Sequence, residues 1–270
     1  MRKRIVQLVR RSLARLGFDI VRLPTIHDAA HHEPVRPYAT YAPWKGDPDF
    51  QNAYGRINQS TLVDIYRLYE LWSLLEQVKD LSGAIIEVGV WRGGSGALLA
   101  WRSKSLGLDA DIYLCDTFEG VVKAGDRDPH YVGGEHSDVD FAAVLSLVSS
   151  ISPRCRILRG IFPDDTGDGL RDQEIRFVHI DVDVYQSAKD VMTFVWPRLV
   201  PGGIVVFDDY GTPFTDGVRQ LADELAESLD CVFIHNLNGH GILIKSSPRP
   251  EAGMRAGSSF VEQQLEPVRS

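Results

Sequence analysis

The chain has 270 residues, of which 44% are hydrophobic, and a formal net charge of -8. A chain of this length can bury one core of about 200 residues with appendages, which argues against two full-sized domains. No apolar run approaches the roughly 20 residues of a membrane-spanning helix, and the acidic balance argues against nucleic acid as the main partner.

The first 22 residues differ from the rest of the chain in charge. They carry seven Arg or Lys residues against one acid, Asp19, with apolar residues interleaved, and this pattern predicts an amphipathic helix. Two interpretations stay open: the helix packs on its own domain or on a neighbouring subunit of a homo-oligomer, or it lies as a peripheral contact on the inner membrane surface. Residues 23–55 contain five prolines and are predicted to form an irregular arm, so that residues 1–55 make up an N-terminal region.

The next part of the chain, residues 56–246, has the pattern of an α/β domain. Apolar side chains recur at helical spacing over residues 61–79, and from residue 84 onward short apolar runs alternate with predicted helices near 94–105, 138–149, 186–198 and 215–228. Strands separated by helices imply parallel crossovers, whereas the two last strands, joined by the short link NLNGH, imply an antiparallel hairpin. We therefore predict a doubly wound, mostly parallel seven-stranded sheet with an antiparallel last strand.

Two further features complete the domain organisation. Residues 247–270 are rich in Ser, Pro, Gly and charge and are predicted to be a disordered tail. The three cysteines, Cys115, Cys155 and Cys231, are far apart and lack metal-ligand spacing. We expect packed free thiols and a cytoplasmic protein.

Ligands of a doubly wound sheet bind at the carboxyl ends of its strands, so the turn from the first strand into the following helix is a candidate binding site. This turn has the sequence EVGVWRGGSG and includes Glu87, Gly89 and Ser95. Glycines allow a tight turn and a close approach of ligand, and the following helix offers unpaired N–H groups to a carboxylate. The spacing departs from G-x-G-x-x-G, and an acid two residues before the first glycine fits S-adenosylmethionine better than a nicotinamide cofactor. A tight packing turn is the alternative.

Two other strand ends could complete a nucleoside site. Asp116 ends the second predicted strand, where a carboxylate can accept hydrogen bonds from both hydroxyls of a ribose. A helix cap or a loop carboxylate is the alternative for Asp116. Gly160 and Phe162 follow the third strand and could flank an adenine, although Phe162 could equally serve only in packing.

The most specific signal is the pair of segments HIDVDVY and FDDYG, which follow two neighbouring strands. Strand alternation puts Asp181 and Asp183 on one side if the extended conformation persists, and Asp208 and Asp209 end the adjacent strand about 5 Å away. Four converging carboxylates repel one another, and a divalent cation such as Mg²⁺, which prefers oxygen ligands, relieves that repulsion. A structural ion-pair network is the alternative, but few basic residues lie near these acids in the sequence.

These segments, in this order, make the chain resemble the macrocin O-methyltransferase family, the metal-dependent sugar O-methyltransferases of natural-product pathways. The resemblance spans roughly residues 62 to 225 and rests on the segments IIEVGVWRGGSG, DTFEG, GDRD, GIFPDD, HIDVDVYQS and PGGIVVFDDYG. It implies a Rossmann-like class I methyltransferase fold, S-adenosylmethionine as methyl donor, Mg²⁺, and a sugar or glycan as acceptor.

The resemblance also implies individual roles. Residues matching Asp181, Asp208 and Asp209 hold Mg²⁺ in the family, and the residue matching Asp183 is the general base. Residues matching Glu87, Gly89 and Ser95 line the methionine end of the cofactor, and Asp116 corresponds to the ribose ligand. Two other functions stay open at this stage: a metal-dependent hydrolase, which has no use for the glycine turn, and a non-catalytic glycan-binding subunit, against which the complete set of acids speaks.

Side chains around the acids have less specific patterns. Tyr185 either orients Asp183, touches the acceptor or packs, and packing is as good an explanation as the others. His179 shares the face of Asp181 but lies deeper in the sheet, where a core histidine with satisfied hydrogen bonds is expected. His130 and His136 belong to an acidic loop over residues 125–140, which is a candidate lid over the acceptor.

Overall fold

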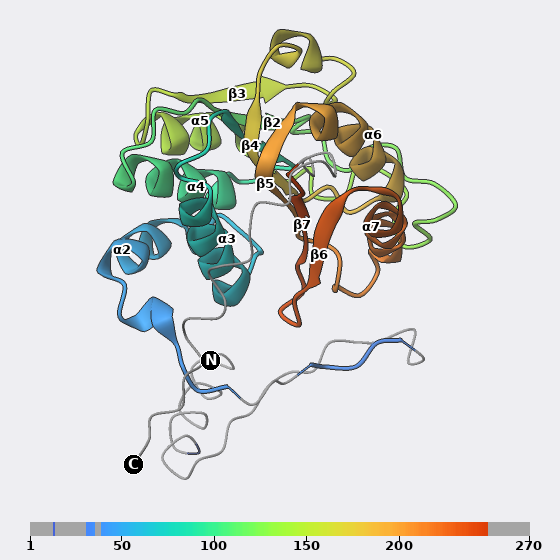
Figure 1. The fold of residues 1–270 in the computed structure, drawn as a ribbon, viewed down its shortest axis with the longest axis horizontal. Helices are drawn as coiled ribbons and strands as arrows, with labels where there is room; N and C mark the ends of the chain where they lie inside the picture. The colour runs from blue at the N-terminus through green and yellow to red at the C-terminus, as the bar shows by residue number, and fades with distance from the viewer. Residues whose placement is uncertain (1–12, 14–30, 36–38, 248–270) are drawn as a thin grey trace, which may run out of the picture.

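The computed structural model describes residue 13, residues 31–35 and residues 39–247. Seven strands form one sheet in the order β3-β2-β1-β4-β5-β7-β6 (Figure 1). Neighbouring strands from β3 to β5 are parallel, whereas β7 is antiparallel to both β5 and β6. The predicted seven-stranded, mostly parallel sheet is confirmed. Its strands are β1 (Ala84–Val88), β2 (Ile112–Asp116), β3 (Cys155–Arg159), β4 (Ile175–Ile180), β5 (Leu199–Phe207), β6 (Cys231–His235) and β7 (Gly241–Lys245).

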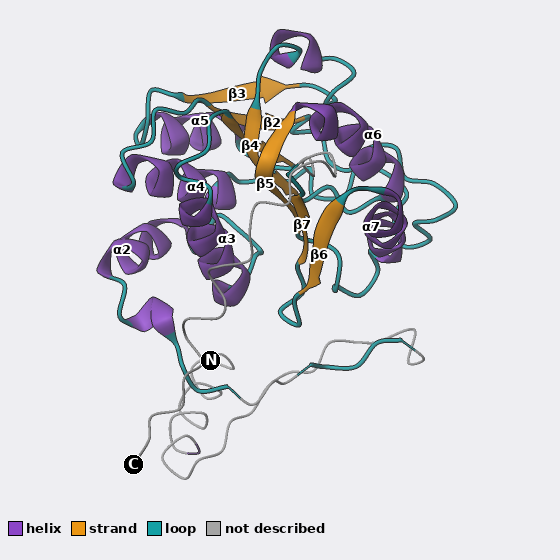
Figure 2. Cartoon of the chain, viewed as in Figure 1, coloured by secondary structure: helices purple, strands orange, loops and turns teal. Residues whose placement is uncertain are grey.

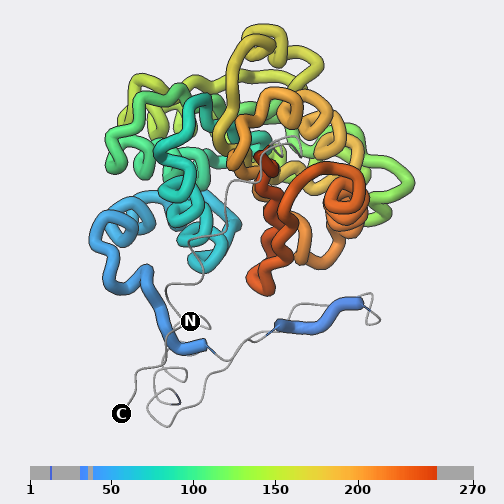
Figure 3. The backbone as a smooth tube through the Cα atoms, viewed as in Figure 1, coloured from blue at the N-terminus to red at the C-terminus, as the bar shows by residue number. Residues whose placement is uncertain are grey.

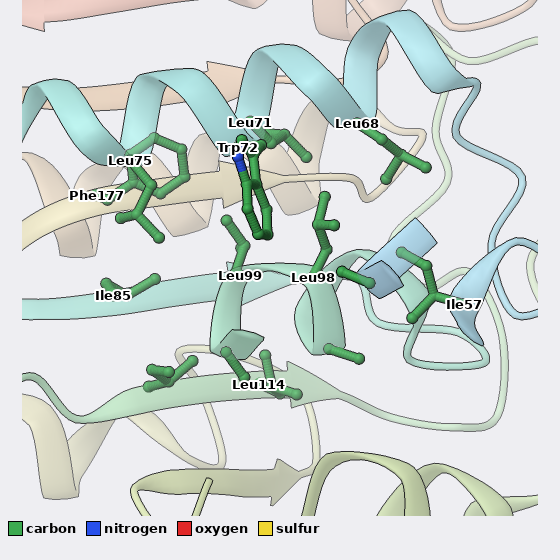
Figure 4. Close-up of a cluster of buried hydrophobic side chains, with 14 of the residues drawn as sticks. Ile57, Leu68, Leu71, Trp72, Leu75, Ile85, Leu98, Leu99, Leu114 and Phe177 are labelled. Atoms are coloured by element: carbon green, nitrogen blue, oxygen red, sulfur yellow. The ribbon is translucent and has the colours of Figure 1, made fainter. Parts of the chain in front are cut away.

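Helices cover both faces of the sheet (Figure 2). One face carries α2 (Pro48–Ile57), α3 (Ile65–Gln77), α4 (Gly94–Ser105) and α5 (Phe141–Ser149), and the other carries α6 (Tyr185–Val195) and α7 (Asp216–Ser228). Three short 3₁₀ turns complete the described elements: η1 (Pro43–Lys45), η2 (Gly167–Leu170) and η3 (Trp196–Arg198). Each face has its own apolar core. Figure 4 shows part of the first core, in which Leu71 and Trp72 of α3 face Leu98 and Leu99 of α4.

The end of the predicted irregular arm is helical, so the prediction was wrong for residues 48–55. Pro48 begins α2, where a missing N–H costs nothing, and the Asp47 side chain caps the helix by accepting from the Phe50 amide at 2.9 Å. Phe50, Ala53 and Ile57 are then buried against the first core. Proline can begin a helix as well as interrupt one, and only the packing of Phe50 distinguishes the two cases.

The chain reverses its direction across the sheet between β1 and β4. From β1 it runs outward to β2 and β3, returns to β4 beside β1, and continues to β5 on the other side. Figure 3 shows the result: the blue-to-teal helices lie on one side of the molecule and the orange-to-red second half on the other, where a green loop of the first half joins it. The connections after β1 and β4 therefore diverge and leave a crevice at their carboxyl ends, which is where such sheets bind ligands.

Several predictions about the ends of the chain lie outside the described residues. The amphipathic helix of residues 1–22, residue 13 apart, and the tail beyond residue 247 are among them. Within the part of the chain that the structure describes, no helix has the length and apolar character needed to cross a membrane.

Candidate active site

A cavity opens at the carboxyl ends of β1, β2, β4 and β5. Gly89, Ser95, Asp116, Gly160 and Phe162, all predicted to bind a cofactor, line it. A second group of predicted residues lines the same cavity, namely the four acids Asp181, Asp183, Asp208 and Asp209. The structure thus brings the two predicted groups together at one site. Glu87 is the exception among the predicted site residues.

The glycine-rich turn is shaped by contact with the neighbouring strand end. Gly89 has a φ of +89°, and a Cβ atom at this position would lie 1.7 Å from the backbone oxygen of Asp181. Only glycine permits both the backbone conformation and the contact. The turn then enters α4 through Gly93, which has a φ of +82°, and the buried Ser95 follows in the first turn of that helix. The turn therefore joins β1 to α4 while in contact with the backbone of Asp181, one of the four predicted acids.

Asp116 is held by backbone amides of the same turn. Its Oδ2 atom accepts hydrogen bonds from the amides of Val90 at 2.6 Å and Trp91 at 2.9 Å, and its Oδ1 atom accepts from the amide of Phe118 at 2.6 Å. A carboxylate has about four lone-pair sites, so these bonds leave capacity for one further donor. The role of Asp116 as a ribose ligand stays a prediction.

Glu87 lies behind the cavity instead of lining it. Its side chain is fully buried, its Oε1 atom is 2.9 Å from Nδ1 of His179, and a Cβ atom at Gly96 would lie 2.5 Å from its Oε2 atom. His179 is also fully buried, and its Nε2 atom is 3.4 Å from Oδ1 of Asp208. Glu87 is therefore linked to Asp208 through His179. His179 is a buried histidine with hydrogen-bond partners on both ring nitrogens, as its position in the strand predicts.

Gly160 and Phe162 form the wall of the cavity beyond β3. Gly160 has a φ of +146°, and its amide donates to the backbone oxygen of Asp116 at 2.9 Å. The ring of Phe162 is 5% exposed and meets the ring of Phe194 edge-on, with centroids 5.1 Å apart. Phe162 thus packs on α6 and also lines the cavity, so its two predicted roles are compatible.

The acids at the ends of β4 and β5 converge. Asp181, Asp208 and Asp209 each offer a carboxylate oxygen, and these oxygens lie within 4.8 Å of one another. Asp183 adjoins them, because its backbone amide donates to Oδ2 of Asp209 at 2.8 Å. The predicted convergence is present, but strand alternation does not produce it for Asp183, because β4 ends at Ile180 and Asp183 has a φ of +66°.

Asp208 has basic partners that are distant from it in the sequence and were not predicted. Arg67 of α3 forms an ion pair with Oδ2 of Asp208, and Nε2 of His240 lies 3.0 Å from Oδ1. Burial raises the pKa of Asp208, but the charge of Arg67 and the bonds to His179 and His240 outweigh it and hold the pKa well below its usual range. The expectation of acids without basic neighbours was therefore wrong for Asp208, since Arg67 and His240 are distant from it in the sequence.

Asp181 and Asp209 have weaker compensation, from the charge of His179 for Asp181 and from the Asp183 amide and the charge of Arg67 for Asp209. Burial and the charge of neighbouring acids raise the pKa of both carboxyl groups well above the usual value. A buried carboxylate without a cation is costly, so this pair requires either protons or a positive ion. Three carboxylate oxygens around one point fit a hard divalent cation such as Mg²⁺, which takes oxygen ligands and leaves the rest of its shell to water or substrate.

Asp183 receives a hydrogen bond from a residue that the sequence analysis did not single out. Its Oδ1 atom accepts from the hydroxyl of Tyr131 at 2.7 Å. The backbone of Asp183 has a φ of +66°, an uncommon conformation for a residue with a side chain, which directs its carboxylate toward the cavity. The spacing of Tyr131 from the GDRD segment carries no pattern that points to Asp183, so only the fold reveals the pair.

The remaining candidates from the sequence, one tyrosine and two histidines, differ in whether they reach the cavity. Tyr185 does not orient Asp183, because its hydroxyl donates to Glu224 of α7 at 2.6 Å. His136 lines the cavity, whereas the ring of His130 meets that of Phe214 edge-on with centroids 4.8 Å apart. Of the loop histidines, His136 therefore has the position that contact with an acceptor requires.

Comparison with known proteins matches the chain to one family. Residues 56–230 match the model of the macrocin-O-methyltransferase (TylF) family. The chain is 33% identical over 165 residues to 8-demethyl-8-(2,3-dimethoxy-alpha-L-rhamnosyl)-tetracenomycin-C 4'-O-methyltransferase of Streptomyces olivaceus, covering 56% of this chain and 62% of the relative. It is 30% identical over 173 residues to mycinamicin III 3''-O-methyltransferase of Micromonospora griseorubida, covering 57% and 66%. The match thus spans just under two thirds of each relative's length.

Solved structures share the fold. The O-methyltransferase NovP superposes with a TM-score of 0.60 at 22% identity, covering 70% of this chain and 83% of that protein. The calicheamicin methyltransferase CalS11 superposes with a TM-score of 0.60 at 16% identity, covering 77% of this chain and 99% of the other. At these identities the likeness concerns the fold, which is that of class I methyltransferases.

Proposed function

Because the chain belongs to the macrocin O-methyltransferase family, we propose that it transfers a methyl group from S-adenosylmethionine to a hydroxyl group of a sugar, in a reaction that depends on Mg²⁺. One observation carries the proposal: the glycine-rich turn and the four acids line the same cavity. A hydrolase that used the acids would have no need of the turn. A glycan-binding protein without activity would have no need of two clustered carboxyl groups whose pKa is raised well above the usual value, those of Asp181 and Asp209.

The donor half of the cavity is suited to a nucleoside linked to an amino acid. The open backbone at Gly89 and the first turn of α4, with Ser95, would receive the methionine part, since helix N-termini bind carboxylates. Asp116 has capacity for one ribose hydroxyl, and Phe162 with Gly160 would border the adenine. Glu87 would act from behind, by fixing His179 against Asp208.

The acceptor half contains the acids. Asp181, Asp208 and Asp209 are the residues that would hold Mg²⁺. When bound, the ion would lower the pKa of an acceptor hydroxyl and orient it. Asp183 is the proposed general base that takes the hydroxyl proton, because its backbone amide bonds to Asp209, one of the three ligands, and the residue lines the cavity. Holding donor and acceptor in line then supplies much of the acceleration.

The acceptor class is proposed from the relatives. The two bacterial relatives are named for methylation of a rhamnosyl-bearing tetracenomycin and of mycinamicin III. We therefore take the acceptor to be a sugar unit of a glycosylated natural product, or a related glycan.

The test is a methyl-transfer assay by mass spectrometry. The purified chain is incubated with S-adenosylmethionine, Mg²⁺ and a panel of rhamnosides and other deoxysugar glycosides, and calorimetry measures donor binding separately. We expect donor binding, a singly methylated glycoside, and loss of product after chelation that added Mg²⁺ restores. Absence of donor binding would refute the methyltransferase proposal, and full activity after thorough chelation would refute its metal dependence.

A further inference from the structure

The hydroxyl of Tyr131 and the carboxylate of Asp183 form a hydrogen bond between two segments distant in the chain. The distance from the hydroxyl oxygen to Oδ1 is 2.7 Å, and the contact is partly buried. Burial and the nearby charge of Asp183 raise the pKa of Tyr131 above its usual value, so the phenol keeps its proton and acts as the donor. Among the described residues, no partner of the other carboxylate oxygen, Oδ2, is found. Of the two carboxylate oxygens of Asp183, Oδ1 therefore accepts a hydrogen bond and Oδ2 is left to a ligand.

The loop that carries Tyr131 is anchored to the same element that begins after Asp183. Asp128 is 2% exposed, and its Oδ1 atom accepts from the backbone amide of Tyr185 at 2.9 Å, at the first residue of α6. The amide of Tyr131 in turn donates to the backbone oxygen of Asp128 at 3.0 Å. A chain of two hydrogen bonds thus ties Tyr131 to α6, only two residues from Asp183.

Close packing reinforces this anchor. A Cβ atom at Gly217 of α7 would lie 2.1 Å from Oδ1 of Asp128, so the helix backbone leaves no space in which Asp128 could shift. The outer part of the loop is different, because Val132 is 92% exposed. The expected lid over residues 125–140 thus has a fixed base near Tyr131 and an exposed tip.

We propose that Tyr131 is a positioning residue for the methyl transfer: it binds Oδ1 of Asp183 and so turns Oδ2 toward the acceptor hydroxyl. This inference rests on the proposed function. In the step concerned, the acceptor O–H bond breaks and its proton passes to Oδ2 of Asp183. The acceptor oxygen forms a bond to the methyl carbon, and the carbon–sulfur bond of the donor breaks with its electron pair remaining on sulfur, which becomes a neutral thioether.

The decisive variant is Tyr131→Phe, which removes the hydroxyl and keeps the ring. Tyr113→Phe is the matched control, since it also removes a hydroxyl at hydrogen-bond distance, 3.5 Å, from a carboxylate, that of Asp111, and Tyr113 does not line the cavity. We expect Tyr131→Phe to lower kcat about 10- to 100-fold, which corresponds to the free energy of one hydrogen bond to a charged group. Donor binding should be unchanged. Tyr113→Phe should keep the wild-type kcat.

A double-mutant cycle distinguishes positioning from general structural support. If Tyr131 acts through Asp183, Tyr131→Phe lowers kcat in the wild-type background but has no further effect on the residual activity of Asp183→Asn. An equal loss in both backgrounds, or a wild-type kcat for Tyr131→Phe, would overturn the proposal. If Asp183→Asn itself keeps full activity, then the general base is wrongly assigned and the role of Tyr131 is wrong with it, while donor binding and product formation still support the proposed reaction.

Asp128→Ala tests the same relationship without changing Tyr131. It removes the anchor of the loop, and we expect kcat to fall while calorimetry still detects donor binding. Should Tyr131→Phe fold poorly, this variant decides the matter, and an undiminished kcat would count against positioning by the anchored loop.

Discussion

The guanidinium group of Arg67 is paired with the carboxylate of Asp208, across 141 positions of the sequence. The same Arg67 also bonds to Asp64 at 2.9 Å, at the start of its own helix. Asp208 is one of the three acids whose oxygens converge, so a fixed positive charge lies at the edge of the proposed metal site. Arg67 and a divalent cation bound there would therefore share the negative charge of one carboxylate.

Arg67→Met removes this charge while keeping much of the apolar stem. We expect the affinity for Mg²⁺ to rise about tenfold at low ionic strength, because a cation a few Å from a metal site opposes binding of the ion. The measurement is calorimetric titration of Mg²⁺ into the chain without donor. Arg56→Met is the control, since Arg56 lies over the ring of Trp101, away from the acids. A weaker or unchanged affinity in Arg67→Met would contradict this account.

Asp183→Asn keeps the shape of the side chain but removes its basicity. General-base catalysis typically contributes 10²- to 10⁴-fold, so we expect kcat to fall by about that factor. Donor affinity should stay within about twofold of the wild type, because the change leaves the glycine-rich turn in place. Single-turnover kinetics and donor calorimetry measure the two quantities. A proportional loss of donor binding would indicate instead that Asp183 supports the structure of the cavity.

Gly89→Ala should destabilise the fold more strongly than Gly107→Ala. Both glycines have positive φ, +89° and +67°, but only at Gly89 would the added Cβ collide with another strand end, at 1.7 Å from the oxygen of Asp181. We expect a loss of more than about 3 kcal/mol for Gly89→Ala and about 1 kcal/mol for Gly107→Ala. Denaturant unfolding monitored by circular dichroism compares them. Similar losses would show that backbone conformation alone accounts for the glycine at position 89.

Cys115 should be chemically inert in the folded protein. Its side chain is fully buried, and burial and the charge of Glu87 raise the pKa of the thiol, so its reactive thiolate form is scarce at pH 8. Labelling with a thiol reagent at pH 8 should modify Cys231, which is only partly buried, before Cys115. Cys115 should react only as denaturant unfolds the chain. Rapid modification without denaturant would mean that the centre of the sheet opens readily.

Much of the fold was predictable because its signals are local. Apolar runs separated by helical stretches predict parallel crossovers, and the segments after β4 and β5 place acids where neighbouring strands end together. The helix α2 was missed because a proline such as Pro48 occurs both at the start of a helix and within a loop. Its assignment depends on the burial of Phe50 and Ile57 against α4 and α3, which no local pattern contains.

The sequence by itself determined the sheet, the glycine turn and the convergence of Asp181, Asp208 and Asp209, because the order of the strands and the points where they end follow from local patterns. Asp183 joins these acids through a left-handed backbone conformation beyond the end of β4, which alternation does not predict. Only the tertiary structure decided the charge state of the cluster. Arg67 and His240 reach Asp208, and Tyr131 reaches Asp183, from elements far away in the chain. Hydrogen bonds and ion pairs act over a few Å in space, whatever the separation in sequence, so partners of this kind become visible only once the helices and loops are packed.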